Sequence, residues 1–177
     1  MTEKNRQGLV QVFTGNGKGK TTAAMGTILR ALGHGLKVKA IFFLKGDYPY
    51  GERNILSRLP NIDIASFGSL EFISPANIKP EDRERANLAL EAAREAALSG
   101  EYDLVVLDEV NVALALKLIE LDEVIQLIDD KPPEVELILT GRQADSRLIE
   151  RADLVTEMTE VKHPFSQGVL ARKGIEY

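Results

Sequence analysis

The hydrophobic residues of the chain occur in short runs separated by polar segments, and this pattern predicts alternating strands and helices. The first run, Leu9 to Phe13, is rich in strand-forming residues and precedes a glycine-rich segment and a helix-compatible stretch from Thr22. A second apolar run, Val38 to Leu44, follows the break at Gly33-His34-Gly35. Residues 9–44 therefore have the length and order of a strand-helix-strand unit, and we expect its two strands to pair in parallel.

The alternation continues in the rest of the chain. An alanine-rich segment begins with Pro80 and acidic residues and is followed by Gly100, which is typical of a helix. Further strands are predicted at Leu104–Leu107 and Val135–Leu139, and further helices at Val112–Leu118 and Leu121–Asp129. The runs Leu104–Leu107 and Leu137–Leu139 are almost continuously apolar, which suits a parallel sheet that is covered on both faces. The pattern thus predicts an α/β fold, a P-loop NTPase-like, doubly wound and mostly parallel sheet with helices on both faces.

The region from Gly46 to Asn77 has the least regular pattern of the chain. It contains glycine, proline and aromatic residues without a clear period, and we interpret it as a long loop. Loops of this length are often functional.

Composition narrows the class of protein. The length of 177 residues and the hydrophobic content of 44% predict one domain over residues 1–177. The polar start of the chain and the lack of a long apolar run predict a cytoplasmic protein without a membrane partner. The absence of cysteine excludes disulfides, thiolate metal sites and cysteine nucleophiles, and the net charge of -5 argues against nucleic acid as a partner.

The segment from Thr14 to Thr21 matches the P-loop pattern G-x-x-x-x-G-K-[ST], except that Thr14 takes the first position. Its closely spaced glycines allow backbone N–H groups to surround phosphate oxygens at a helix N-terminus. Lys20 supplies a catalytic cation, Lys18 an additional one, and the Thr21 hydroxyl a ligand for Mg²⁺. The residues expected to bind the phosphates of ATP are Thr14, Gly15, Asn16, Gly17, Lys18, Gly19, Lys20, Thr21 and Thr22.

Two adjacent carboxylates, Asp108 and Glu109, follow the predicted strand Leu104–Leu107. A P-loop protein holds its metal at this place, so both are candidate metal ligands together with Thr21. Acidic residues at the end of a strand also cap the helix that follows, and the pattern does not separate the two carboxylates.

Arg142 follows the strand predicted at Val135–Leu139 and should reach the same edge of the sheet. Ligands of open α/β folds bind at that edge, which makes Arg142 a candidate catalytic contact to phosphate or substrate. The alternative is an ordinary surface arginine. The histidines, His34 and His163, lie far apart in the sequence, so we expect structural roles for them and no Ser-His-Asp set.

Taken together, these residues resemble the P-loop ATP:corrinoid adenosyltransferases of cobalamin assimilation, over nearly the whole chain from Gly8 to Tyr177. The segments that carry the resemblance are Phe13 to Ala24, Gly33-His34-Gly35, Lys45-Gly46, Gly51 to Asn54, Val105 to Glu109, Thr140-Gly141-Arg142, Val161 to Phe165 and Gly174 to Tyr177. Thr14 in the first P-loop position also suits that family.

The resemblance implies transfer of the 5′-deoxyadenosyl group of ATP to the Co(I) centre of a reduced corrinoid, such as cob(I)alamin or cob(I)yrinic acid a,c-diamide, with release of triphosphate. It implies a homodimer that depends on Mg²⁺, or alternatively Mn²⁺, and an external reductant for cobalt. It also implies an inverted nucleotide orientation and metal ligation by Thr21 and Glu109.

The family's corrinoid-side loop carries Gly-Phe-x-Trp, whereas this chain has Phe67-Gly68-Ser69-Leu70-Glu71-Phe72 and no tryptophan. Phe67, Leu70 and Phe72 are candidates for contacts to the corrin face, and ordinary packing is the alternative. Two other functions stay open at this point: an NTPase or kinase that acts at the γ-phosphate, and a non-catalytic protein that binds nucleotide or corrinoid.

Overall fold

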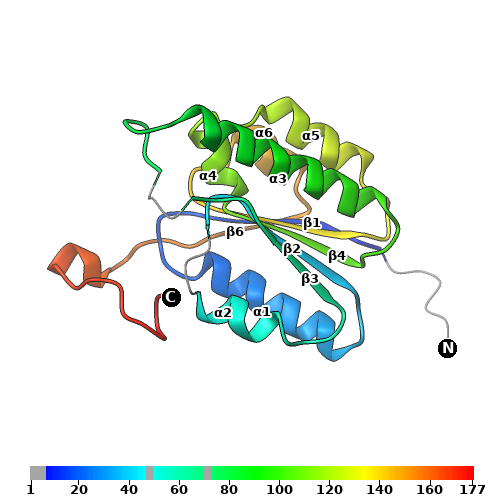
Figure 1. Cartoon of the computed structure of the whole chain (residues 1–177), viewed down its shortest axis with the longest axis horizontal. Coiled ribbons are helices and arrows are strands. Elements are labelled where there is room, and N and C mark those ends of the chain that lie inside the picture. Colours follow the sequence, from blue (N-terminus) through cyan, green and yellow to red (C-terminus); the bar gives the residue numbers. More distant parts are fainter. Residues whose placement is uncertain (1–6, 47–49, 70–72) are drawn as a thin grey trace.

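The computed structural model describes residues 7–46, 50–69 and 73–177, which form an α/β fold around one six-stranded sheet (Figure 1). Its strands are β1 Val10–Thr14, β2 Val38–Phe42, β3 Ile62–Ser66, β4 Leu104–Asp108, β5 Glu136–Thr140 and β6 Leu154–Glu157. Their order is β3-β2-β4-β5-β1-β6, and every neighbouring pair is parallel. The carboxyl ends of all the strands therefore meet at one edge of the sheet.

Burial decides which strands lie in the middle. All residues of β4 are buried, and β5 is buried except at its first residue, whereas the edge strands β3 and β6 are partly or wholly exposed. Strands that are apolar on both faces need helices on both faces, so β4 and β5 occupy the centre.

Helices cover both faces, as the sequence pattern predicts (Figure 1). One face packs against α1 Lys20–Gly33 and α2 Gly51–Leu56. The other face packs against α3 Pro80–Leu98, α4 Val110–Ala115, α5 Leu121–Asp130 and α6 Ser146–Arg151. A short 3-10 helix, Pro164–Gln167, lies in the segment after β6. Among the described helices, none combines the length and apolar character needed to cross a membrane.

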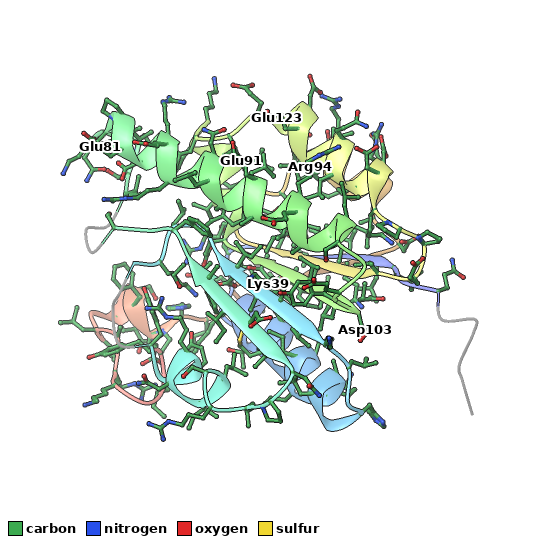
Figure 2. All side chains as sticks on the ribbon, turned by 45° about the vertical axis from the view of Figure 1, so that its right-hand side comes forward. Lys39, Glu81, Glu91, Arg94, Asp103 and Glu123 are labelled. Atoms are coloured by element: carbon green, nitrogen blue, oxygen red, sulfur yellow. The ribbon has the colours of Figure 1, made fainter. Side chains whose placement is uncertain are left out.

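The alanine-rich segment forms helix α3 as predicted. Pro80 occupies its first turn, and the Asp82 carboxylate accepts a hydrogen bond of 2.9 Å from the Lys79 backbone N–H. The buried alanine side chains of α3 allow a close approach to the sheet. The charged side chains Glu91 and Arg94 lie on the exposed side of α3, away from the sheet, and Arg94 pairs with Asp130 of α5 (Figure 2).

Two sequence expectations about the fold are wrong. Strands β1 and β2 are parallel but do not pair with each other, because the more buried β4 and β5 lie between them. The region 46–77, interpreted as a long loop, contains α2 and β3. The shortness of α2, which has six residues, and the exposure of β3 at the sheet edge explain the weak pattern. Elements α6 and β6 also have no counterpart among the predictions, and the helix predicted at Val112–Leu118 begins and ends earlier.

Candidate active site

The predicted phosphate-binding loop and the acidic residues lie at the carboxyl edge of the sheet. The glycine-rich loop connects β1 to α1, Asp108 ends β4, and Thr140 ends β5. Lys45 comes just after β2, which is the neighbour of β4. Parallel pairing therefore places side chains from four separate segments around the N-terminus of α1.

The glycines of the loop are required by close backbone contacts as well as by their conformation. Gly15 and Gly19 have φ angles of 96° and 121°, which favour glycine. The Gly17 N–H donates a hydrogen bond of 2.6 Å to the Met158 carbonyl oxygen. A Cβ atom at Gly15 or Gly17 would lie 2.5 Å or 2.7 Å from that same oxygen. The chain leaving β6 thus lies directly against the loop.

The two loop lysines have different environments. Lys20 is buried, and its Nζ donates a hydrogen bond of 2.6 Å to the Gly17 carbonyl oxygen. Burial lowers the pKa of Lys20, Glu109 raises it, and Arg142 lowers it further, with a net decrease. Lys18 is exposed, and its ammonium pairs with the Glu176 carboxylate at 2.9 Å. Of the two loop lysines, Lys20 is therefore the one that the fold holds inside the site.

Asp108 lies at the centre of a buried hydrogen-bond network and is only 1% exposed. Its Oδ2 accepts from Lys45 Nζ at 2.7 Å, and its Oδ1 accepts from the Thr140 hydroxyl at 2.8 Å. The Thr140 hydroxyl oxygen in turn accepts from the Glu109 backbone N–H at 3.0 Å. Lys45 Nζ also donates to the Thr21 hydroxyl at 3.4 Å. Both Asp108 oxygens are thus already occupied by protein donors.

Glu109 contrasts with its neighbour. Its φ of 65° is in the left-handed region, and among the described residues no donor bonds its carboxylate. Burial raises the pKa of Glu109, and Asp108 raises it further, against opposing effects of Lys45, Lys20 and Arg142. Neither side chain caps α4, so the helix-cap alternative is not realised.

The oxygen atoms of Thr21, Asp108 and Glu109 are of the hard type that Mg²⁺ prefers, so these residues fit a magnesium ion. Within the described ranges, no group of three or more His, Cys, Asp or Glu residues could hold a metal ion. A metal at this site therefore needs further ligands, and phosphate oxygens are of the right kind.

Arg142 follows a constrained turn at the end of β5. Gly141 has a φ of 128°, and a Cβ atom there would lie 3.0 Å from the Asn111 Cβ. The Asn111 side chain is fully buried and donates to the Gly141 carbonyl oxygen at 3.3 Å. Arg142 is exposed, and its charge acts on the pKa of Lys20 and of Glu109. The structure thus brings Arg142 into the neighbourhood of the P-loop lysine.

Phe67 is the described member of the predicted corrinoid side, whereas Leu70 and Phe72 lie outside the described residues. Phe67 is partly buried and packs against the core on the α3 face of the sheet, which agrees with the packing alternative. A Cβ atom at Gly68 would lie 2.4 Å from the Lys45 backbone. The segment after β3 therefore lies directly against the chain that carries Lys45.

Sequence reasoning missed the role of Lys45, although Lys45-Gly46 directly follows an apolar strand. Its ammonium is 5.2 Å from the centroid of the Tyr50 ring, and Arg53 donates to the Gly46 carbonyl oxygen at 2.5 Å. A lysine just beyond the carboxyl end of a central strand was the available signal. Thr140 and Asn111 were also missed, because their contacts depend on neighbouring strands far apart in the sequence.

Comparisons with known proteins show the family of this chain. The family model described as ATP:corrinoid adenosyltransferase BtuR/CobO/CobP matches residues 6–177. The corrinoid adenosyltransferases of Escherichia coli K12 and Pseudomonas aeruginosa are each 38% identical over 174 residues, which is 98% of this chain and 88% and 86% of those proteins. The corrinoid adenosyltransferase of Salmonella typhimurium is 37% identical over 98% of this chain and 88% of its own length.

A solved structure shares the fold at much lower identity. The flagellar accessory protein FlaH from Methanocaldococcus jannaschii superposes with a TM-score of 0.60 at 11% identity, covering 86% of this chain and 71% of that chain. This likeness concerns the fold alone, and the predicted P-loop NTPase-like class is confirmed. From its family match and its relatives, the chain belongs to the ATP:corrinoid adenosyltransferase family.

Proposed function

We propose that the protein transfers the 5′-deoxyadenosyl group of ATP to the Co(I) centre of a reduced corrinoid and releases triphosphate. The observation that carries the proposal is the cluster of Lys20, Thr21, Glu109 and Arg142 around the glycine-rich loop, in a chain of this family. In the reaction a cobalt lone pair attacks C5′, a Co–C bond forms, and the C5′–O bond breaks. The electron pair of the broken bond stays on the triphosphate.

The side chains of the site suit this chemistry because Co(I) has no proton to lose. No general base is needed, and the strongest demand is on the stabilisation of the leaving triphosphate. Lys20 is buried next to the loop and is oriented by its bond to Gly17, so little reorganisation is required when phosphate arrives. Arg142, on the neighbouring turn, adds a second cation.

We assign metal ligation to the Thr21 hydroxyl and the Glu109 carboxylate. A bound Mg²⁺ would supply charge neutralisation for the phosphates. Glu109 has carboxylate oxygens that are free of protein donors among the described residues, whereas both Asp108 oxygens are taken by Lys45 and Thr140. Asp108, predicted as a ligand beside Glu109, then serves to position Lys45.

The remaining parts of the proposal rest on family membership. They are a homodimeric state, a cytoplasmic location, an external reductant for cobalt, and a corrinoid site formed with the segment that follows β3. Mn²⁺ is the expected substitute for Mg²⁺.

The test is a product assay with ATP, Mg²⁺ and chemically reduced cobalamin. We expect a light-sensitive Co–C bond and stoichiometric triphosphate. ADP as the product, with or without corrinoid, would replace the proposal by an NTPase or kinase, and saturable binding without turnover would indicate a binding protein. Lys20→Ala should lose ATP binding, whereas Lys39→Ala on β2 should retain it.

A further inference from the structure

Lys45 lies where a metal ion would meet the P-loop threonine. Its Nζ is 2.7 Å from Asp108 Oδ2 and 3.4 Å from the Thr21 hydroxyl oxygen, and its side chain is 14% exposed. The Phe42 and Tyr50 rings flank the ammonium at 5.7 Å and 5.2 Å from their centroids. An ammonium thus occupies the space beside the hydroxyl that is expected to bind the metal.

The site already holds cations without a metal, because the charges of Lys45, Lys20 and Arg142 act on the Glu109 carboxylate. The ammonium groups of Lys20 and Lys45 face the carboxylates of Asp108 and Glu109. A divalent cation added alone would be repelled by both lysines, and among the described residues its expected ligands would be Glu109 and the Thr21 hydroxyl that Lys45 contacts. A triphosphate brings several negative charges and further oxygen ligands, and only then does the site favour a metal.

The two bonds of Lys45 differ in strength. The bond to Asp108 is short and charge-assisted, whereas the contact to Thr21 is near the limit for a hydrogen bond. The Thr21 contact can therefore be given up at little cost while the ion pair is kept.

From these contacts we propose that Lys45 fills the cation position next to Thr21 in the nucleotide-free protein, so that the metal binds only together with the nucleotide and displaces the ammonium from Thr21. This inference rests on the proposed metal role of Thr21 and Glu109. Lys45 is a positioning residue that sets the order of binding, and Asp108 retains it when the metal enters.

The experiment measures Mn²⁺ binding by electron paramagnetic resonance, without nucleotide and with saturating ATP. Wild-type protein should bind Mn²⁺ weakly alone and at least about tenfold more tightly as the ternary complex, since phosphates supply the missing ligands. Lys45→Met, which removes the ammonium, should bind Mn²⁺ without nucleotide about tenfold or more tightly than wild type.

Two further variants complete the design. Lys45→Gln retains a donor for Asp108 and should give the same gain, which keeps the test decisive if the methionine variant does not fold. Lys39→Met is the matched control, because Lys39 lies within β2, away from the loop, and contacts Tyr102, with its ammonium 5.8 Å from the ring centroid (Figure 2). It should bind Mn²⁺ as wild type does.

The outcomes separate this inference from the proposed function. If folded Lys45 variants bind Mn²⁺ no more tightly than wild type, the proposed role of Lys45 is wrong, and the proposed function is unaffected. Wild-type protein that binds Mn²⁺ equally well with and without ATP would also overturn it. A wild-type protein that binds no Mn²⁺ even with ATP would overturn both this inference and the metal site, while the cobalt-carbon product assay remains a separate measurement.

Discussion

Replacing Asp108 by asparagine should destabilise the protein strongly. Asp108 is 1% exposed and pairs with Lys45, whose side chain is 14% exposed. The Asp108→Asn substitution would leave the Lys45 ammonium partly buried without a counter-charge at bonding distance. Removing one partner of a buried pair costs about 3–5 kcal/mol, and the residual exposure of Lys45 favours the lower end, about 3 kcal/mol. This is a large part of the roughly 5–15 kcal/mol that stabilises a typical domain.

The adjacent substitution Glu109→Gln provides the matched control, with the opposite expectation. The pKa of Glu109 is raised in the folded protein, chiefly by burial and then by Asp108. A carboxyl group with a raised folded-state pKa binds its proton more tightly when folded, so its contribution to stability is present below the unfolded pKa and is lost as the pH rises through the folded pKa. Ionisation of Glu109 therefore weakens the nucleotide-free fold, and Glu109→Gln, which cannot ionise, should be at least as stable as wild type.

The assay is urea unfolding at pH 7 followed by far-ultraviolet circular dichroism, with the slope m unchanged among the variants. Asp129→Asn, which breaks an exposed ion pair with Arg151, serves as a surface control and should lower the free energy of unfolding by at most about 1 kcal/mol. If Asp108→Asn lowers the free energy of unfolding by less than about 1 kcal/mol, the Asp108–Lys45 pair does not stabilise the fold as its burial implies. A loss for Glu109→Gln equal to that of Asp108→Asn would refute the asymmetry between the two acids.

Two further predictions concern the sheet and its turns. Gly141→Ala should lower the free energy of unfolding by about 1–3 kcal/mol, because the φ of 128° is strained for alanine and the new Cβ would lie 3.0 Å from that of Asn111. Gly100→Ala is the control, because Gly100 has a φ of 72° and open space around it. In the same unfolding assay it should lower the free energy of unfolding by only about 1 kcal/mol. The pKa of Tyr102 is raised to about 12, by burial and by its bond to Asp63. Protonated Tyr102 therefore stabilises the folded protein below its unfolded-state pKa of about 10, and this stabilisation is lost as the pH rises to the folded-state pKa of about 12. An absorbance titration should therefore show one high-pKa tyrosine that is missing in Tyr102→Phe, and an unchanged curve would contradict the assignment.

The centre of the fold could be predicted from the sequence because its signals are local. The runs that became β1, β2, β4 and β5 are mostly apolar, with Gln11 and Lys39 as polar residues inside β1 and β2, and α3 begins with proline and acids and ends before glycine. The edge strands gave no such signal. Strand β6 has two apolar residues, Leu154 and Val155, and β3 alternates Ile62, Asp63 and Ile64, so neither shows the pattern of a strand that is buried on both faces.

The strand order could not be derived from the same signals. A strand-helix-strand unit has two parallel strands, but the sequence of that unit does not show whether other strands will lie between them. Here β4 and β5, which are contributed much later in the chain, separate β1 from β2 because they are the strands with both faces buried.

The candidate site was predicted where each residue belongs to a local motif. The glycine-rich loop, the acids after β4 and Arg142 after β5 all follow an apolar strand. The hydrogen-bond partners that distinguish Asp108 from Glu109 belong to no local motif of the sequence. Lys45 reaches Asp108 from the end of β2, and Thr140 reaches it from β5, so the difference between the acids exists only when three strands are side by side.

That difference also explains how one short acidic segment can serve two purposes. Asp108 is fully bonded and holds a lysine in place, a state that stabilises the fold. Glu109 is adjacent, in a left-handed backbone conformation and without a donor among the described residues, a state that costs stability until a cation arrives. Because attack by Co(I) requires no proton transfer, neither acid has to act as a base, and both can be committed to cations. Under the proposed function, these residues hold a departing triphosphate and do not activate a nucleophile.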